Sequence, residues 1–152
     1  MWKENKIVIR APLFDRLTDL NPETRDEGRP RSTLTHEQLT RSVAQELELL
    51  LNTRSPLPLA DLTGREPSVI DYGVPDLGGY LSTEDENQVQ LRGAFVRAIQ
   101  AYEPRLSRVK VELEPRADRP RALRVKINAH LTLARVSEPV SFIVNVEQSC
   151  SP

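Results

Sequence analysis

The segment LRVKINAHLTL, residues 123–133, decides the fold, because its apolar and polar residues alternate without interruption. Alternation with a period of two places the apolar side chains on one face of a β-strand and the polar ones on the other. Residues 109–113 and 140–146 alternate in the same way. Short polar connections join the three segments. The three alternating segments and their short connections predict a three-stranded antiparallel meander with one buried face, from about residue 108 to 147.

Working back from the sheet, the preceding segment has helical periodicity. Thr83 and Glu86 form a capping-box pattern, and apolar residues follow at intervals of three and four. Pro104 disfavours the helical conformation of the residue before it, so this helix is predicted to end near Tyr102.

Two further helices are predicted closer to the N-terminus. Thr35 and Gln38 form another capping box, and a stripe of leucine and valine continues to about Asn52. A shorter amphipathic helix is predicted over residues 12–20. The predicted fold class is therefore α+β, with three helices followed by the meander and packed on one face of it.

The domain boundaries follow from the same pattern. Residues 1–11 are predicted to be an N-terminal extension, residues 12–147 a single domain and residues 148–152 a short tail. Residues 55–82 are rich in proline and glycine and predict an unusually long loop. Loops of this length within a domain are often functional or serve as interaction surfaces.

Composition excludes several classes of function. Lys and Arg number 21 against 22 Asp and Glu, so the basic excess of a nucleic-acid-binding protein is missing. Cys150 is the single cysteine, and His36 and His130 are far apart in sequence, so no zinc site and no cofactor are predicted. Residues 7–9 form only a short apolar run, and no later run reaches the length of a membrane span. A soluble, cytoplasmic protein is expected.

Paired carboxylates are the only catalytic ingredient that the sequence suggests. Glu103, beside Tyr102, is the candidate for the buried general acid of a peptidoglycan-cleaving enzyme. Arg105 is two residues away, however, and a nearby cation favours the charged carboxylate, which is the wrong direction for a general acid. No catalytic residue is assigned, and a protein that is not an enzyme is expected.

Four short motifs occur in a fixed order and carry a resemblance to a known family. The motifs are LFDRL at residues 13–17, SVAQELELLLNTR at 42–54, SVIDYGVPDL at 68–77 and YEPRL at 102–106. In this order, and with the strands that follow, the chain resembles the TssE family. This family is the type VI secretion branch of a larger family that includes a baseplate wedge protein of contractile-tail phages.

The resemblance implies a structural subunit of the type VI secretion baseplate. Such a protein joins the wedge proteins TssF and TssG, near TssK, to the first ring of the contractile sheath built from TssB and TssC. The implied location is the cytoplasm, in a baseplate docked at the inner membrane. By the same resemblance Glu103, Pro104 and Arg105 correspond to a Glu-Pro-Arg motif that contacts baseplate partners. The alternatives are a small regulatory adaptor of the same fold and a lysozyme-like enzyme.

Two further groups of residues are candidates for defined roles. Asp71, Tyr72, Gly73, Pro75 and Asp76 are interpreted as a structural turn with a packed tyrosine. Glu103 and Arg105 have a structural alternative of their own, an ion pair that fixes the turn between helix and strand.

The last strand of the meander is predicted to be an edge strand that offers its backbone to a partner. Its residues Ser141, Ile143 and Asn145 are the predicted contacts, and Pro139 is placed just before the strand. The alternative is that a loop or residues 7–9 already cover this edge.

Overall fold

The computed structural model describes residues 9–10, 23, 33–58, 61, 64–76, 85–115, 122–133 and 136–147. The chain divides into two units, Met1–Val43 and Ala44–Pro152. The helix predicted over residues 12–20 lies outside the described residues. None of the helices that the structure describes is both long and apolar enough to span a membrane.

In the first unit, β1 (Ile9–Arg10) pairs antiparallel with β2 (Thr33–Leu34), and Ile9 lies opposite Leu34. Helix α2 (His36–Asn52) begins directly after β2 and continues into the second unit. Its first turn has the predicted capping box. The Thr35 amide donates to the Gln38 side chain at 3.0 Å, and the Gln38 amide donates to the Thr35 hydroxyl at 3.3 Å.

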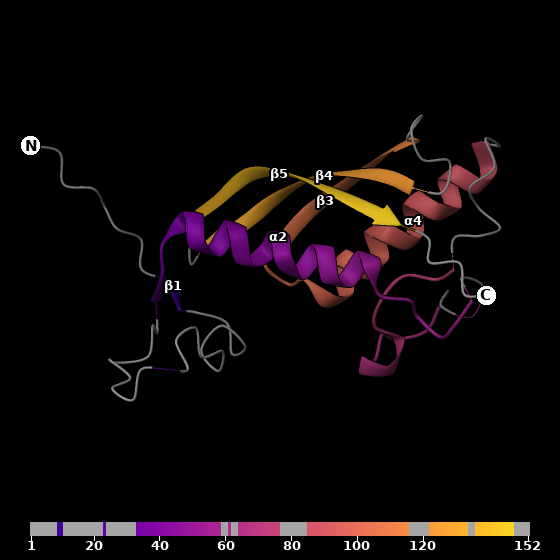
Figure 1. Ribbon diagram of the computed structural model, residues 1–152, viewed down its shortest axis with the longest axis horizontal. Coiled ribbons are helices and arrows are strands. Elements are labelled where there is room, and N and C mark those ends of the chain that lie inside the picture. The colour runs from indigo at the N-terminus through magenta and orange to yellow at the C-terminus, as the bar shows by residue number, and fades with distance from the viewer. Residues whose placement is uncertain are drawn as a thin grey trace, which may run out of the picture. The chain divides into compact units, whose positions relative to one another are not determined.

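The second unit contains the predicted meander. Its strands are β3 (Leu106–Pro115), β4 (Ala122–Leu133) and β5 (Val136–Glu147), in the spatial order β3-β4-β5 (Figure 1). All pairs are antiparallel, as predicted. Each strand extends by at least one residue beyond the segment that alternation alone had marked.

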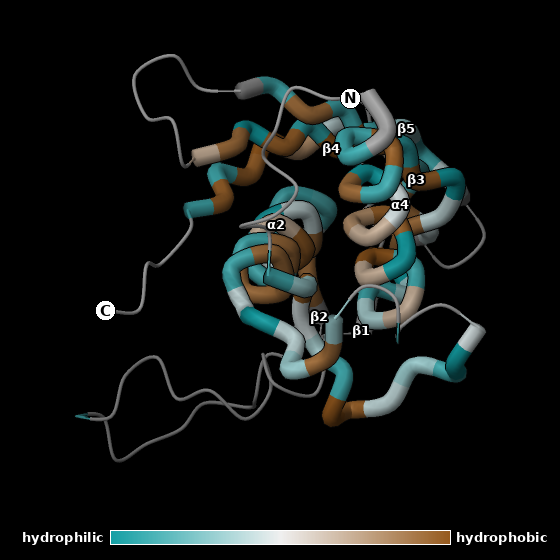
Figure 2. The backbone as a smooth tube through the Cα atoms, turned by 90° about the vertical axis from the view of Figure 1, so that its right-hand side faces the viewer, coloured by the Kyte–Doolittle hydropathy of each residue, from teal (hydrophilic) through white to brown (hydrophobic). Residues whose placement is uncertain are grey.

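One face of the sheet is buried, and hydrophobic and hydrophilic residues alternate along the strands (Figure 2). Helix α4 (Asp85–Tyr102) contacts β3 and contributes fully buried side chains to the core. Burial of each large aliphatic or aromatic side chain stabilises the fold by roughly 1.5–3 kcal/mol. The residues of this unit that are no more than 1% exposed are Leu47, Leu51, Val74, Phe95, Ile99, Val125, Ile127, Leu131 and Val146.

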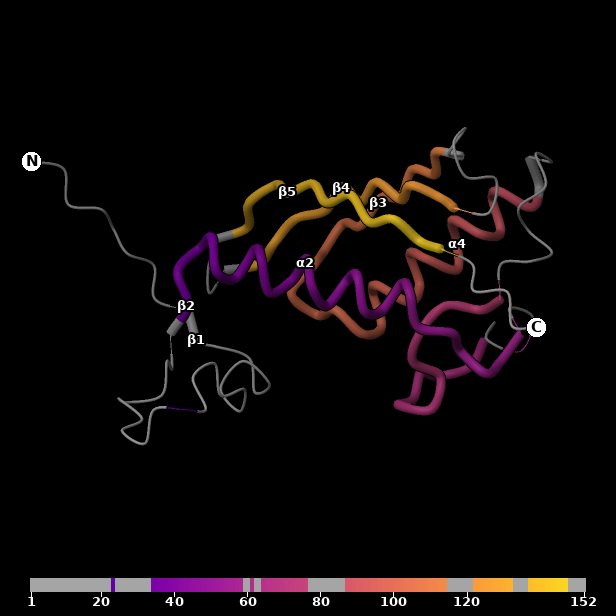
Figure 3. Tube along the Cα trace, viewed as in Figure 1, coloured from indigo at the N-terminus to yellow at the C-terminus, as the bar shows by residue number. Residues whose placement is uncertain are grey.

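The α+β class is confirmed, but the number of helices differs from the prediction. In the described part of the chain two α-helices, not three, precede the sheet, together with a 3₁₀ turn, η1 (Val69–Asp71). Figure 3 shows the path of the chain from α2 through the segment that contains η1 and on to α4 and the sheet. The end of α4 at Tyr102 agrees with the position expected from Pro104.

Candidate functional site

Strand β5 is an edge strand of the three-stranded sheet, as predicted, but part of its outer edge is already hydrogen-bonded. The side-chain amide of Asn52 donates from Nδ2 to the Asn145 carbonyl at 3.2 Å. Its Oδ1 accepts from the backbone N–H of Glu147 at 3.4 Å. Arg54 donates to the Glu147 carbonyl at 3.1 Å. The end of α2 and the residues after it therefore cover the C-terminal end of the β5 edge.

These contacts fix which backbone groups of β5 point away from β4. The β4–β5 register is unbroken, and in an antiparallel pair alternate residues direct both backbone groups to the same side. Asn145 and Glu147 point outward, so Ser141 and Ile143 do as well. Among the described residues no backbone hydrogen bond reaches their outward groups. The exposed part of the edge is thus centred on Ser141 and Ile143, and their side chains are exposed.

Pro139 lies inside β5, opposite His130, and not just before the strand as predicted. Its backbone groups point to the same side as those of Ser141 and Asn145. The N–H group that proline lacks would therefore have faced away from β4. Proline is tolerated in edge strands on this condition. The strand therefore continues through Pro139 without the loss of a ladder hydrogen bond.

A groove of about 510 Å³ lies on the polar side of the sheet beside this edge. Its lining includes Arg108 and Lys110 of β3 and Ser141 of β5. Arg108 has a φ of 52° where the β3–β4 register shifts, which marks a β-bulge. Arg108 and Lys110 therefore lie on the β3 side of the groove, and β4 separates them from the exposed edge of β5.

The Glu-Pro-Arg turn joins α4 to β3 and is held by side-chain and backbone hydrogen bonds. The Arg105 guanidinium donates from Nε to Glu103 Oε1 at 2.6 Å and from a terminal nitrogen to Oε2. The Arg105 backbone amide also donates to Oε1, at 3.2 Å. The Thr132 amide donates to the Arg105 carbonyl at 2.9 Å, so the turn is attached to β4.

Burial of this pair corrects one premise of the sequence interpretation. A surface ion pair contributes only ~0–1 kcal/mol, and the pair was expected to be of this kind. The Glu103 side chain is 3% exposed and that of Arg105 is 22% exposed. Glu103 is a buried carboxylate that depends on Arg105 for its hydrogen bonds, so the structural part of its role is larger than expected.

The segment Asp71–Asp76 is anchored to the residues that follow α2. The Val74 amide donates to the Thr53 carbonyl at 2.9 Å, and the Ser55 amide donates to the Val74 carbonyl at 2.8 Å. Gly73 directly precedes Val74 and has a φ of +111°, which side chains rarely tolerate. A Cβ atom at Gly73 would lie 2.5 Å from the Thr53 oxygen. Only glycine fits this close approach.

The side chain of Asp71 is buried, and one of its oxygens has no hydrogen-bond partner among the described residues. Its Oδ2 accepts from the Ser68 amide at 3.0 Å and the Ser68 hydroxyl at 2.9 Å, and Arg65 Nε lies 3.6 Å away. Its Oδ1 is buried, and no donor in the described part of the chain reaches it. A buried acceptor without a donor costs roughly 1–3 kcal/mol.

Tyr72 of this segment and Tyr102 of α4 pack edge to face, with ring centroids 5.2 Å apart. Burial raises the pKa of Tyr102, the negative charge of Asp71 raises it further, and Arg97 partly opposes the shift. Burial also raises the pKa of Tyr72, with smaller contributions from Glu46 and Glu103. Both phenols therefore stay protonated at neutral pH, and the Tyr102 hydroxyl donates to the Ser68 carbonyl at 2.8 Å.

Sequence reasoning missed Asn52 and Arg54 as the residues that cover the end of the β5 edge. Asn52 was placed at the end of a helix and Arg54 lies two residues beyond it, and nothing in the sequence signals a contact with a strand more than ninety residues later. It also missed the exposed Val69 and Ile70, which are 90% and 74% exposed. The signals available for them were the length of the loop from residue 55 to 82 and their place in the motif at residues 68–77.

The described residues contain no group of three or more His, Cys, Asp or Glu side chains that could hold a metal ion. The site is instead made of a strand edge with exposed backbone groups, a buried ion-paired turn and a glycine-anchored loop. Of these features, the exposed strand edge is the one that can pair with an extended segment of another chain.

The family model of baseplate wedge protein gp25 matches residues 37–135. The chain belongs to this family, and the resemblance inferred from the sequence motifs is confirmed at this level. No curated protein sequence matches the chain significantly.

Two solved structures are similar in fold. One is a chain of the baseplate complex from the type VI secretion system, with 21% identity and a TM-score of 0.50. That match covers 74% of this chain and 97% of the other. The second is a protein described as a tail lysozyme from Geobacter sulfurreducens, with 13% identity and a TM-score of 0.49. It covers 77% of this chain and 99% of the other.

Proposed function

We propose that this protein is a structural baseplate subunit of a type VI secretion system and joins the wedge complex to the first ring of the contractile sheath. Membership of the baseplate wedge family supports the structural role. The observation that carries the link to the sheath is the exposed outer edge of β5 at Ser141 and Ile143. TssF, TssG and TssK are the proposed wedge partners, and TssB and TssC the proposed sheath partners.

Strand addition explains how such an edge recruits another chain. Backbone donors and acceptors supply much of the affinity, so no special side chains are required. The covering of Asn145 and Glu147 by Asn52 and Arg54 limits pairing to the part of β5 before Asn145. The register of an added strand is therefore restricted, which suits a subunit that has to start a polymer in one orientation.

Ser141→Pro tests this proposal, because it removes one outward N–H and leaves the β4–β5 ladder intact. The variant is expected to fold and to bind TssF and TssG as the wild type does. Its ability to start sheath assembly should fall about tenfold or more, since a lost backbone hydrogen bond and the proline ring both oppose strand addition. Sheath assembly from purified TssB and TssC on reconstituted baseplates is the measurement.

Ser141→Ala is the matched control. It removes the side-chain hydrogen bond from the Ser141 hydroxyl to Asn128 at 3.0 Å but keeps the backbone N–H. It should start sheaths at the wild-type rate. Normal sheath assembly with Ser141→Pro would exclude this edge as the sheath contact. Failure of the wild-type protein to bind TssF and TssG would refute the proposed function itself.

A purely structural role also predicts that the protein has no peptidoglycan-cleaving activity. Glu103 is held by Arg105, so it is not the unpaired buried carboxyl that a general acid requires. The purified protein should leave the turbidity of a peptidoglycan suspension unchanged at neutral and mildly acidic pH. Reproducible lysis that disappears in Glu103→Gln would overturn this conclusion.

A further inference from the structure

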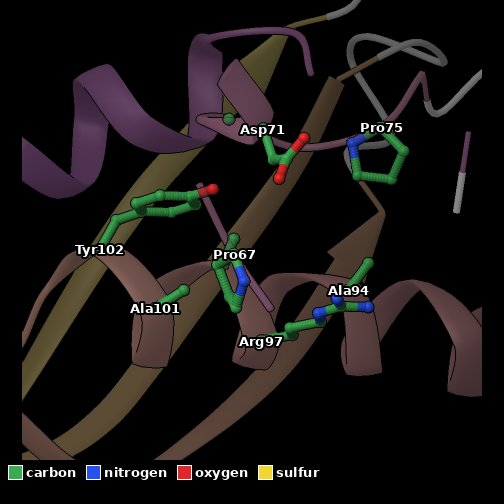
Figure 4. A pocket seen from close by; sticks show the side chains of 9 residues that line it. Pro67, Asp71, Pro75, Ala94, Arg97, Ala101 and Tyr102 are labelled. Carbon is green, nitrogen blue, oxygen red and sulfur yellow. The ribbon is translucent and has the colours of Figure 1, made fainter. Parts of the chain in front are cut away.

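Two hollows of the structure differ in whether they can hold part of another chain. The cavity between η1 and α4, lined by Asp71 and Tyr102 among others, has a volume of about 20 Å³, which is room for one water molecule (Figure 4). The groove on the polar face of the sheet has a volume of about 510 Å³. Of the two, the groove is the one that is large enough for a peptide segment.

The groove is bounded by two rows of side chains that run across the strands. The first row consists of register partners from β3, β4 and β5, namely Lys110, Asn128 and Ser141. In the second row His130 of β4 lies opposite Pro139 of β5, and Arg108 occupies the bulge of β3 between the rows. An extended segment placed between the rows would cross the strands, and the two cations would lie at its β3 end.

The cations of the groove differ from two other cations on the same face of the sheet. The latter are ion-paired with glutamates of β3 at 3.9 and 3.2 Å, namely Arg124 with Glu114 and Lys126 with Glu112. The structure gives Arg108 and Lys110 no ion pair or side-chain hydrogen bond with any residue that it describes. Both are exposed, and the groove has no acidic residue among its described lining. It therefore presents two positive charges that no described carboxylate neutralises.

The backbone of Arg108 gives a second, independent reason to assign a role to its side chain. Its φ of 52° lies in the left-handed region, where a residue with a Cβ atom is strained and glycine is not. No contact of the Arg108 side chain with the described residues offsets this strain. Strained residues of this kind are concentrated at functional sites, and a β-bulge redirects the side chain that it carries. The side chain of Arg108 is therefore expected to bind a group outside these residues.

Charge and composition select the occupant. Arg and Lys side chains donate strong, charge-assisted hydrogen bonds to carboxylates. A nucleic acid requires a longer stripe of cations, and this chain has 21 Lys and Arg against 22 Asp and Glu. We propose that the groove binds an acidic, extended segment of a partner protein, and that Arg108 and Lys110 hold a carboxylate of that segment. This contact is additional to the strand edge of β5 and goes beyond the proposed function.

A short fluorescein-labelled peptide of alternating Glu and Ser is the probe, and the same peptide with Gln in place of Glu is its neutral counterpart. The purified wild-type protein should bind the acidic peptide more tightly than the neutral one, and added salt should weaken this binding. Arg108→Gly and Lys110→Ala should each reduce the affinity about fivefold, the usual limit for one exposed ion pair. Fluorescence anisotropy is the measurement.

Arg124→Ala is the matched control, because it removes a cation from the same face that is ion-paired and does not line the groove. It should bind the acidic peptide as the wild type does. Arg108→Gly should also have a Tm equal to or above that of the wild type, since glycine removes the strain. Weaker binding without loss of stability distinguishes a binding role of Arg108 from a structural one.

Several results would overturn the proposal. Equal binding of the acidic and neutral peptides, or wild-type affinity in Arg108→Gly and Lys110→Ala, would exclude the groove as the site. An equal loss in Arg124→Ala would assign the attraction to the whole face of the sheet. Tighter binding of a single-stranded DNA oligonucleotide or of anionic phospholipid vesicles than of the peptide would show that the occupant is not an acidic protein segment. None of these measurements uses TssF, TssG or the sheath, so their failure and failure of the proposed function are distinguishable.

Discussion

Gly73→Ala is expected to destabilise the protein by about 3 kcal/mol or more. Two costs add at this position, the strain of a side chain at positive φ and the overlap of its Cβ with the backbone. Gly73 has a φ of +111°, and its Cβ would lie 2.5 Å from the Thr53 oxygen and 2.9 Å from the Thr53 carbonyl carbon. These atoms belong to the backbone, which cannot move aside as a flexible side chain would.

Urea unfolding of three alanine variants separates the two costs. Gly64 has a φ of +80° but open space around it, so Gly64→Ala should cost only about 1 kcal/mol of backbone strain. Gly93 lies in α4 with nothing near its Cβ position, so Gly93→Ala should stabilise by about 0.5–1 kcal/mol. If Gly73→Ala costs no more than Gly64→Ala, the close approach to Thr53 has no energetic importance.

Arg105→Ala is expected to cost about 3 kcal/mol of stability, and more than the double variant Glu103→Ala/Arg105→Ala. The single change leaves the Glu103 carboxylate buried, 3% exposed, without the Arg105 guanidinium. Breaking a buried pair by removing one partner typically costs 3–5 kcal/mol, whereas removing both partners costs much less. Glu103→Ala should cost less than Arg105→Ala, because the Arg105 side chain is 22% exposed and can reach water.

A double-mutant cycle by urea unfolding measures this asymmetry. Additive effects of the two single variants would show that the pair is not coupled and would contradict the prediction. The double variant also tests the role of the turn in assembly. Binding of the folded double variant to TssF and TssG should be weaker than wild type if the turn contacts a partner, and unchanged if the turn only connects α4 to β3.

The sequence predicted the secondary structure of the described core well, because local periodicity determines it. Alternation placed the meander correctly, and the capping residues Thr35 and Gln38 predicted the start of α2. Pro104 predicted the end of α4 at Tyr102. Each of these signals involves residues that are close in sequence, so it can be recognised without knowledge of the fold.

Tertiary contacts decided which side chains of the candidate site are buried and hydrogen-bonded. Exposure of the Glu103–Arg105 pair was misjudged, since the sequence places the two residues together but does not show what covers them. The burial of Asp71 Oδ1, to which no described residue donates, has the same origin, because part of its surroundings comes from α4. Burial depends on segments that are distant in sequence, and local patterns do not report it.

The sequence by itself determined that the last third of this protein forms a three-stranded meander and that β5 lies at its edge. Only the tertiary structure decided which part of that edge is exposed. Asn52 and Arg54 bind the backbone of Asn145 and Glu147, and no backbone hydrogen bond from a described residue reaches the outward groups of Ser141 and Ile143. The physical reason is that the alternation of a strand is a property of neighbouring residues. Whether the backbone groups at its edge are hydrogen-bonded depends on any donor or acceptor that folding brings within about 3 Å.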